Sequence, residues 1–513
     1  MKKLSTLTKV SLMLAIFFGI DKLLGYLRLR LTLGQFALSA EYDVFNAANN
    51  LPDMLFMLIS GGALAIAFIP VLTEVLTKKG KEQAWNLFSN ILNIAFLLTG
   101  VLAILVAIFA RPLITNELGI APGFTPEQID LTVRLLRLNL VSTLIFSVSG
   151  LVMAGLQANQ HFLLPALAPI FYDLGQIFGV VILSPAEGYS IGGFTLPAFN
   201  LGVDGLVYGV IIGALLHLLI QVPGLIKYRF KWRPKVDLKD ADTRKVFRMM
   251  APRLVSMFCI QMIFLAQDNF ASRLDEGSVS ALTTGWWIMQ VPQTLLGTSI
   301  ATAVLPTLSE LFTNERFNAL KEKIENAVQV MLGLTIPVAI VAGVVLTPAI
   351  SALLPLDAMA TARVVEVSRI FLIGIVGHSV VELIVRSFYA MQQPKYPLIG
   401  AVLTLILFIL FGITLTPIMQ ASGIALSNTL AYSLQAVVLL FLLNSKLETK
   451  LSLLPSFLRA LLGALVGGAL AFGIVNYLPR FAGTLIGAVI AGGAGLLIGA
   501  IFVRKELLAL RQL

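Results

Sequence analysis

The chain has 513 residues, of which 58% are hydrophobic and only 12% are charged. Soluble globular proteins are about 25% charged, so this composition excludes a soluble globular fold. The 37 lysines and arginines outnumber the 27 aspartates and glutamates, which in a membrane protein indicates basic cytoplasmic loops and attraction to anionic lipid rather than nucleic-acid binding.

Apolar stretches long enough to span a bilayer, about 20 residues each, recur from end to end. They predict an all-α polytopic membrane protein with about fourteen transmembrane helices. Lys2 and Lys3 precede the first stretch without a small-residue cleavage site, so we expect this helix to be retained. In chain order the predicted helices are 8–31, 43–76, 84–110, 129–157, 161–184, 200–226, 246–273, 278–312, 319–346, 361–391, 395–416, 421–444, 452–477 and 481–503.

The charge of the connecting segments alternates along the chain. One set reads NELGIAPGFTPEQID, SPAEGYSIGG and RLDEGS and is neutral to acidic. The other set is basic, which predicts that it faces the cytoplasm together with both termini. The basic residues of this second set are Lys78, Lys79, Lys81, Lys227, Arg229, Lys231, Arg233, Lys235, Arg316, Lys321, Lys323, Lys395, Lys446, Lys450, Arg504, Lys505 and Arg511.

An internal repeat divides the chain. The stretch AFIPVLTEVLTKKGKEQAWNLFSNIL from Ala67 resembles AVLPTLSELFTNERFNALKEKIENAV from Ala303, and GLQANQHFLLP from Gly155 resembles YAMQQPKYP from Tyr389. Six predicted helices separate the copies, so both copies have the same orientation, which predicts two parallel lobes with a substrate path between them. We therefore expect a lobe at 1–226, a basic linker at 227–245, a second lobe at 246–450 and two further helices at 451–513. The linker is either an interfacial amphipathic segment or a solvated connection.

The second predicted helix is polar at its start and apolar afterwards. Asp43, Pro52 and Asp53 precede an apolar run that is interrupted at Gly61. Polar side chains at membrane depth must face protein or a wet cavity, so this pattern predicts a cavity-lining helix with a proline–glycine break. An ordinary span that starts at the level of the headgroups is the alternative.

Charged residues inside the first and seventh helices are candidates for binding an anion. Lys22 lies nearer to the middle of its helix than a snorkelling lysine would, and Asp21 beside it can neutralise it. Arg28 can bind substrate or reach the outer headgroups, and Arg253 can bind a phosphate or reach cytoplasmic headgroups.

Three features of the later helices are interpreted mainly as structural. Glu382 and Arg386 are spaced as an intrahelical ion pair. Trp286 and Trp287, which precede Gln290, are interfacial anchors or a stacking wall for a sugar or peptide. The glycine pairs of the last two helices, Gly463 with Gly467 and Gly495 with Gly499 among them, predict close helix packing and can also shape a groove for a lipid tail.

The chain resembles the MurJ/MviN lipid II flippases of the MATE-like, polysaccharide-exporter (MOP) superfamily over nearly its whole length. The resemblance is carried by YDVFNAANNLPDML, GGALAIAFIPVLTE, PEQIDLTVRLLRL, PALAPIFYDLGQIFG, GLVYGVIIGALLHLLIQVPGL, EGSVSAL, ATAVLPTLSE and ELIVRSFYAMQQPKYP. It implies two pseudo-symmetric six-helix lobes, a tail-binding groove in the last two helices, and a multi-pass protein of the bacterial inner membrane. It also implies alternating access around a cationic cavity that neutralises the diphosphate of lipid II.

Matches to the family's charged positions are partial. Asp43, Pro52 and Arg28 match the family pattern, and Lys22 keeps the charge of a usual arginine without its bidentate fork. The departures are Asp21 for Ser, Asp53 for Asn, Phe56 and Met57 for arginines, Gly61 for Glu, Trp286 and Trp287 for an Asp-Arg pair, and Gln290 for Glu.

Several functions remain compatible with these residues. The first is flipping of the polyprenyl-diphosphate-linked peptidoglycan precursor, with Lys22, Arg28, Asp43, Asp53, Arg253, Trp286 and Trp287 as substrate contacts. Asp21, Pro52, Gly61, Gln290, Glu382 and Arg386 would then be gate or structural residues. The alternatives are a flippase for another lipid-linked oligosaccharide, a polysaccharide-repeat or drug exporter, and a transport-inactive paralogue that binds lipid or cell-wall synthesis proteins.

An enzyme is not expected. The predicted spans lack an acid–base or nucleophile constellation, and the three histidines (His161, His217 and His378) and the single cysteine, Cys259, have no zinc-type spacing. We therefore expect no cofactor and no metal.

Overall fold

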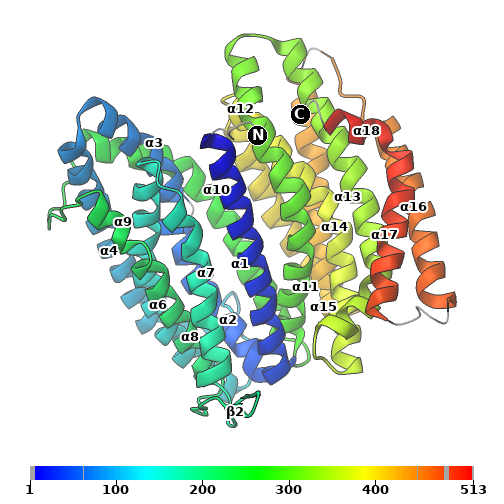
Figure 1. Cartoon of the computed structure of the whole chain (residues 1–513), viewed down its shortest axis with the longest axis horizontal. Helices are drawn as coiled ribbons and strands as arrows, with labels where there is room; N and C mark the ends of the chain where they lie inside the picture. Colours follow the sequence, from blue (N-terminus) through cyan, green and yellow to red (C-terminus); the bar gives the residue numbers. More distant parts are fainter. Residues whose placement is uncertain (1–5, 62, 448, 479–483, 511–513) are drawn as a thin grey trace. The chain divides into compact units, whose positions relative to one another are not determined.

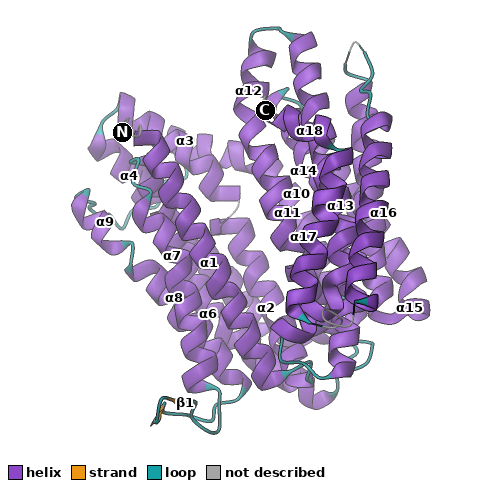
Figure 2. Cartoon of the chain, turned by 45° about the vertical axis from the view of Figure 1, so that its right-hand side comes forward, coloured by secondary structure: helices purple, strands orange, loops and turns teal. Residues whose placement is uncertain are grey.

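The computed structural model describes residues 6–61, 63–447, 449–478 and 484–510, and these ranges are almost entirely helical (Figures 1 and 2). They form two compact units, Met1–Arg273 and Leu274–Leu513. The one sheet in the described ranges is a two-stranded hairpin, β1 (Ser190–Ile191) with β2 (Phe194–Thr195). The predicted all-α polytopic fold is confirmed.

The helices of the two units have the following bounds. The first unit contains α1 (Thr6–Phe36), α2 (Ala40–Phe56), η1 (Met57–Gly61), α3 (Ala63–Lys78), α4 (Lys81–Ile108), α5 (Ala110–Thr115), α6 (Pro126–Ala158), α7 (Leu163–Phe178), η2 (Gly179–Leu183), α8 (Val203–Leu219), α9 (Val222–Lys227) and α10 (Ala241–Ala271). The second unit contains α11 (Ser278–Gln293), η3 (Thr294–Thr298), α12 (Ser299–Thr313), α13 (Phe317–Leu353), α14 (Ala358–Ala390), α15 (Lys395–Asn444), α16 (Leu454–Tyr477), α17 (Leu485–Phe502) and α18 (Arg504–Ala509).

Each of the fourteen predicted segments is helical over most of its described residues, and the observed helix ends differ from the predicted ends by a few residues. In the described ranges, eleven helices are long and apolar enough to cross a membrane. α15 is one of them and holds two predicted segments, 395–416 and 421–444, which meet at the break at Gln420. The first two predicted helices are not among these eleven. They correspond to the charge-bearing α1 and to the α2–η1–α3 segment, and both are helical. Lys2, Lys3, Arg511 and the start of the last predicted helix at 481–483 lie outside the described residues.

α10 belongs by its contacts to the first unit, whereas the repeat places this segment at the start of the second lobe. It packs against α3 and α2, and two ion pairs join its first turns to the end of α3. Lys79 Nζ lies 2.6 Å from Asp242 Oδ2, and Lys245 Nζ lies 2.5 Å from Glu74 Oε2. The unit boundary at Arg273 therefore differs from the predicted linker at 227–245, and the two-lobe division by repeat stays a prediction.

Two backbone irregularities of the first repeat recur at corresponding places in the second. The predicted break in the second helix is the π-helical turn η1, Met57–Gly61. The repeat offset, 303 − 67 = 236 residues, moves this turn to 293–297, one residue before η3, Thr294–Thr298. Gly202, directly before α8, and Gln420, directly before the twelfth predicted helix, have nearly identical backbone angles of φ 53°, ψ −135° and φ 52°, ψ −135°. Because π-helical turns are rare, their matched positions support the repeat independently of sequence similarity.

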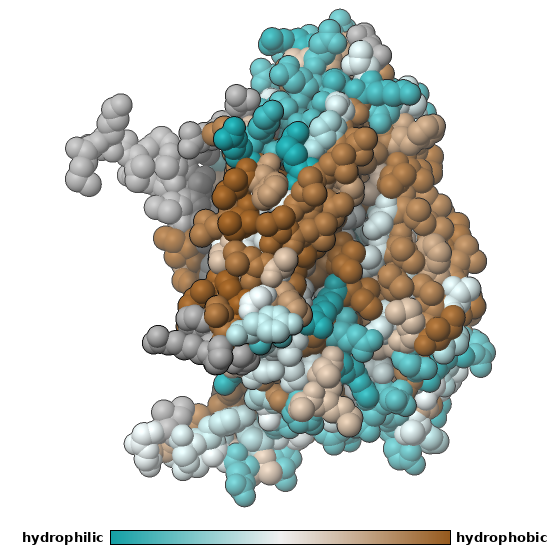
Figure 3. All heavy atoms as spheres, turned by 90° about the vertical axis from the view of Figure 1, so that its right-hand side faces the viewer, coloured by the Kyte–Doolittle hydropathy of each residue, from teal (hydrophilic) through white to brown (hydrophobic). Residues whose placement is uncertain are grey.

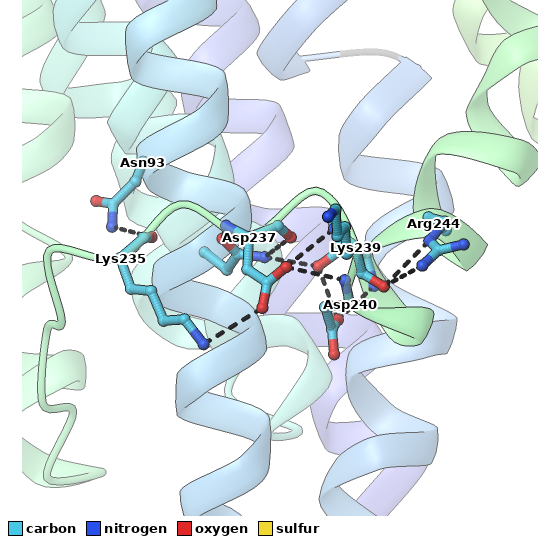
Figure 4. A network of polar contacts seen from close by, with 8 residues as sticks. Asn93, Lys235, Asp237, Lys239, Asp240 and Arg244 are labelled. Atoms are coloured by element: carbon cyan, nitrogen blue, oxygen red, sulfur yellow. Dashed lines mark hydrogen bonds and ion pairs between the residues drawn. The ribbon is translucent and has the colours of Figure 1, made fainter.

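The linker before α10 is an extended segment held by α4 rather than a helix (Figure 4). Asn90 donates to the carbonyl of Asp237 (2.8 Å) and accepts from its N–H (2.7 Å), while Asn93 donates to the carbonyls of Arg233 and Lys235. The N–H of Lys239 and the Lys235 ammonium hold the pKa of the Asp237 carboxyl below its usual range. Hydrogen bonds to α4 therefore hold residues 235–240 against the first unit, and α10 begins at Ala241.

The last two long helices pack closely through glycine, as predicted. α16 and α17 lie side by side against α13 (Figure 1). A Cβ added at Gly467 would lie 2.2 Å from the carbonyl oxygen of Gly495, and one at Gly463 would lie 2.9 Å from that of Gly499. The face on which these helices lie is a broad hydrophobic band between two hydrophilic ends (Figure 3). Its exposed apolar side chains include Leu462, Leu465, Val466, Val489, Leu497 and Ile501.

This packing predicts opposite effects for two glycines on one helix. Gly467→Ala is expected to destabilise the second unit by about 1–3 kcal/mol, because the added methyl group pushes α16 away from α17. Gly473→Ala is the matched control, since a Cβ there meets nothing within 4 Å, and alanine favours helix. Thermal unfolding of the two purified variants in the same detergent measures the difference; equal melting temperatures would contradict this account of the packing.

Candidate functional site

Arg28 of α1 is the centre of the polar contacts inside the first unit. Its Nε lies 3.6 Å from Oδ1 of Asp173, and its Nη1 donates to Oε1 of Gln176 at 2.5 Å. Asp173 and Gln176 are three residues apart on α7, so both face α1. The Arg28 side chain is 32% exposed, whereas that of Asp173 is only 9% exposed. The guanidinium therefore points into the unit from a partly open position, rather than only toward headgroups.

Small residues place α7 where it can hold Arg28. A Cβ at Gly175 would lie 2.3 Å from the backbone of Gly213 on α8, and one at Gly179 would lie 2.6 Å from Gly209. This contact is possible only because both helices present glycine at the crossing. Packing against α8 thus fixes the face of α7 that carries Asp173 and Gln176.

Asp21 and Lys22 extend the charged cluster along α1. Lys22 Nζ lies 3.4 Å from Asp21 Oδ2, as the sequence suggested, and the Lys22 side chain remains 55% exposed. Both charges act electrostatically on Asp173. Asp53 on α2 is exposed and interacts electrostatically with Arg28. We call Asp21, Lys22, Arg28, Asp53 and Asp173 the α1 charge cluster. It combines two cations with three carboxylates, so it is less cationic than the sequence indicated.

The polar side of α2 is satisfied by neighbouring helices of the same unit. Asn50 donates to Oδ2 of the buried Asp268 on α10 at 2.9 Å, and Asn139 of α6 donates to Asn49. Asp43 is buried, and the carbonyl of Pro52 accepts a long hydrogen bond from Thr143 (3.5 Å). Pro52 precedes the π-helical turn that ends at Gly61, so the predicted break is real. This α2 face is mainly protein-facing, except at Asp53.

In the second unit, Trp286 belongs to an aromatic group around His378. The indole packs edge-on against His378 (5.2 Å between centroids) and Phe371 (5.7 Å). The His378 ring stacks on Tyr432 at 3.7 Å and hydrogen-bonds through Nε2 to Asn428 at 2.9 Å. Trp286 is thus half-buried and fixed by packing against Phe371 and His378.

The predicted ion pair of α14 is present and has an additional partner. Arg386 Nη2 lies 2.6 Å from Oε1 of Glu382, and Arg386 also donates to the hydroxyl of Thr302 and to the carbonyl of Thr298 (3.5 Å). The pair therefore connects α14 to the end of η3 and the start of α12. Its contacts support the structural interpretation.

The remaining predicted residues lie as follows. Arg253 on α10 and Trp287 on α11 are half-buried, and Gln290 is exposed. Arg253 and the α1 charge cluster belong to the first unit, while both tryptophans, Gln290, Glu382 and Arg386 belong to the second.

Sequence reasoning missed three residues that the structure makes prominent. Asp173 and Gln176 hold Arg28, and His378 supports Trp286. The signal for Asp173 was present, since a lone carboxylate in an apolar helix needs a partner. In the part of the chain that the structure describes, no group of three or more His, Cys, Asp or Glu side chains could hold a metal ion.

Comparisons with known proteins agree with this architecture. The family model described as "Lipid II flippase MurJ" matches residues 34–492. A probable lipid II flippase MurJ of Buchnera aphidicola is 28% identical over 435 residues, covering 83% of this chain and 81% of its own length. The lipid II flippase MurJ of Burkholderia cenocepacia is 26% identical over 463 residues, covering 88% of this chain and 86% of its own.

Solved structures share the fold at low sequence identity. A lipid II flippase MurJ in an inward closed conformation aligns with a TM-score of 0.77 and 22% identity, covering 96% of this chain and 98% of its own. An inward-facing multidrug resistance MATE transporter of the MOP superfamily aligns with a TM-score of 0.65 and 14% identity, covering 84% and 97%. The family-model match spans most of the chain, and this multi-pass membrane protein, a transporter rather than an enzyme, belongs to the MurJ lipid II flippase family.

Proposed function

We propose that this chain is an alternating-access flippase that moves lipid II, a polyprenyl-diphosphate-linked peptidoglycan precursor, from the cytoplasmic to the outer leaflet. The observation that carries the proposal is the family match over residues 34–492. The alternating basic loops support a topology with both termini in the cytoplasm. This mechanism requires no covalent step, so the side chains only bind the substrate and release it.

Arg28 is the residue proposed to bind the diphosphate. Its guanidinium is partly exposed and is already oriented by a carboxylate and an amide. Phosphate oxygens form the same charge-assisted hydrogen bonds as a carboxylate, often in pairs. A diphosphate that enters the unit therefore replaces Asp173 at Arg28, while Gln176 and the exposed Lys22 add further donors.

Exchange of one anion for another also explains release. A guanidinium without a partner at membrane depth is costly, so an empty cavity that closes around an unpaired Arg28 would be unfavourable. Asp173 returns to Arg28 as the substrate leaves and removes this cost. We infer that Asp173 is the intrinsic competitor that keeps diphosphate binding reversible.

The sugar and the lipid tail are assigned to the second unit. Trp286, held against His378 and Phe371, is proposed to stack on a sugar ring, with Trp287 beside it. The exposed apolar side chains of α16 and α17 are proposed to contact the polyprenyl tail. Arg253, Asp43 and Asp53 remain proposed substrate contacts, and Asp21, Pro52, Gly61, Gln290, Glu382 and Arg386 remain proposed gate or structural residues.

A specific observation favours a second candidate. The α1 charge cluster has more carboxylates than cations, and tryptophans stand where the resemblance implies an Asp-Arg pair. Both features suit a lipid-linked oligosaccharide that is richer in sugar and poorer in charge than lipid II. Cell-wall synthesis proteins are the proposed protein partners if the chain binds lipid without transporting it.

Complementation tests the proposed function. Expression of this chain in a bacterial host depleted of its lipid II flippase is expected to restore growth, and Arg28→Ala is expected to abolish the rescue. Arg30→Ala is the matched control, because Arg30 is an exposed arginine on the same helix. Absence of rescue by the unsubstituted chain, at normal membrane levels, would favour the second candidate.

The role of Asp173 gives a separate prediction with the opposite sign. Asp173→Asn removes the competing charge but keeps the shape, so affinity for undecaprenyl diphosphate is expected to rise about fivefold, since an ion pair at this separation contributes roughly 1 kcal/mol. Release is expected to become slower. Titration of the purified variant with undecaprenyl diphosphate measures the change. Weaker binding by Asp173→Asn would mean that Asp173 positions Arg28 rather than competes with the ligand.

A further inference from the structure

The second unit has a pocket where three basic segments of the sequence meet. It has a volume of about 310 Å³ and is lined from the end of α12, the start of α13, the α14–α15 turn and the segment after α15. The sequence places Arg316, Lys321 and Lys323 in the first of these connections, Lys395 in the second, and Lys446 and Lys450 in the third. Of these residues, Lys321 and Lys446 line the pocket, so the fold brings together two lysines that are more than a hundred residues apart in the chain.

Lys446, which lines the pocket, and Lys395, at the start of α15 beside it, both approach one aromatic ring. Lys395 Nζ lies 5.1 Å and Lys446 Nζ 5.8 Å from the centroid of the Tyr396 ring. Tyr396 is itself buried and packs at a tilt against Phe388, with 4.8 Å between the ring centroids, so the ring is fixed. Each ammonium gains a cation–π contact with this ring, so the ring holds two positive charges at the edge of the pocket. Lys321, which also lines the pocket, pairs with Glu325 at 2.5 Å.

The rest of the pocket is apolar or neutral. Phe312, Phe317, Met391 and Leu447 form the apolar part of its lining, and Asn318 and Gln393 add neutral hydrogen-bonding groups. A free phosphate would use the lysines and amides but would gain nothing from the phenylalanines. A ligand with a phosphate next to a hydrocarbon portion uses both parts of the lining.

We propose that this pocket binds the headgroup and glycerol portion of an anionic phospholipid, phosphatidylglycerol. Basic pockets between helices on the cytoplasmic side of membrane proteins recognise such headgroups. Lys446 contacts the phosphate, Lys395 beside the pocket adds positive charge, and the aromatic and aliphatic lining contacts the glycerol and the first methylenes. The pocket lies apart from Trp286 and His378 in the sequence and shares no residue with them, so it is a regulatory or anchoring lipid site. Only the choice of leaflet rests on the proposed topology.

Lipid retention by the full-length chain tests the proposal. Native mass spectrometry in a neutral detergent compares binding of phosphatidylglycerol with that of chain-matched phosphatidylcholine. We expect one phosphatidylglycerol to bind more tightly than any phosphatidylcholine. K395Q together with K446Q is expected to weaken this binding roughly thirtyfold, about fivefold for each lysine removed.

Two control variants distinguish an effect of the pocket lysines from a general loss of charge and from a folding defect. K231Q with K239Q removes two exposed lysines from the first unit, and binding should remain unchanged. K395R with K446R keeps both charges, and binding should remain within a fewfold of that of the original chain.

Three results would overturn the proposal. These are equal retention by the original and K395Q/K446Q chains, equal retention of the two lipids, or displacement of phosphatidylglycerol by millimolar inorganic phosphate, which would indicate a free-anion site. Because binding is measured without transport, this outcome is independent of the proposed flippase activity.

Discussion

Pairing of charge inside the helix bundle is the constraint on which the first unit depends. An arginine in a membrane-spanning helix must have a partner or reach water, and Arg28 has Asp173 and Gln176 on the neighbouring helix. The glycine contacts of α7 with α8 fix the position of these partners. Packing, charge balance and the proposed exchange of Asp173 for a diphosphate are therefore consequences of one arrangement.

The polar groups inside the two units differ in kind. In the first, the polar groups are charged and grouped around α1. In the second, the corresponding interior is aromatic and neutral around His378, with one ion pair that connects α14 to α12. The corresponding positions of the π-helical turns η1 and η3 support the predicted repeat. The side chains of its two copies have diverged, which is consistent with assigning phosphate to one unit and sugar to the other in our proposal.

Much of the fold could be predicted from the sequence because membrane spans are long apolar runs with basic or acidic ends. The proline–glycine break in the second helix and the close packing of Gly467 on Gly495 were also predictable from local patterns. The partner of Arg28 was not, because Asp173 lies 145 residues away and sequence spacing carries no information on such contacts. Nor could the repeat predict that α10 packs with the first unit, since its contacts with α3 and α2 join residues far apart in the sequence.

Translocation by the purified chain is the most direct test of the central claim. Liposomes that contain the protein and lipid II should expose lipid II on both leaflets with time, measured by its accessibility to a soluble enzyme that consumes it. The account predicts that the original chain moves lipid II and that Arg28→Ala, correctly inserted, does not. Movement that is unchanged in Arg28→Ala, or no movement of lipid II by the original chain, would contradict it.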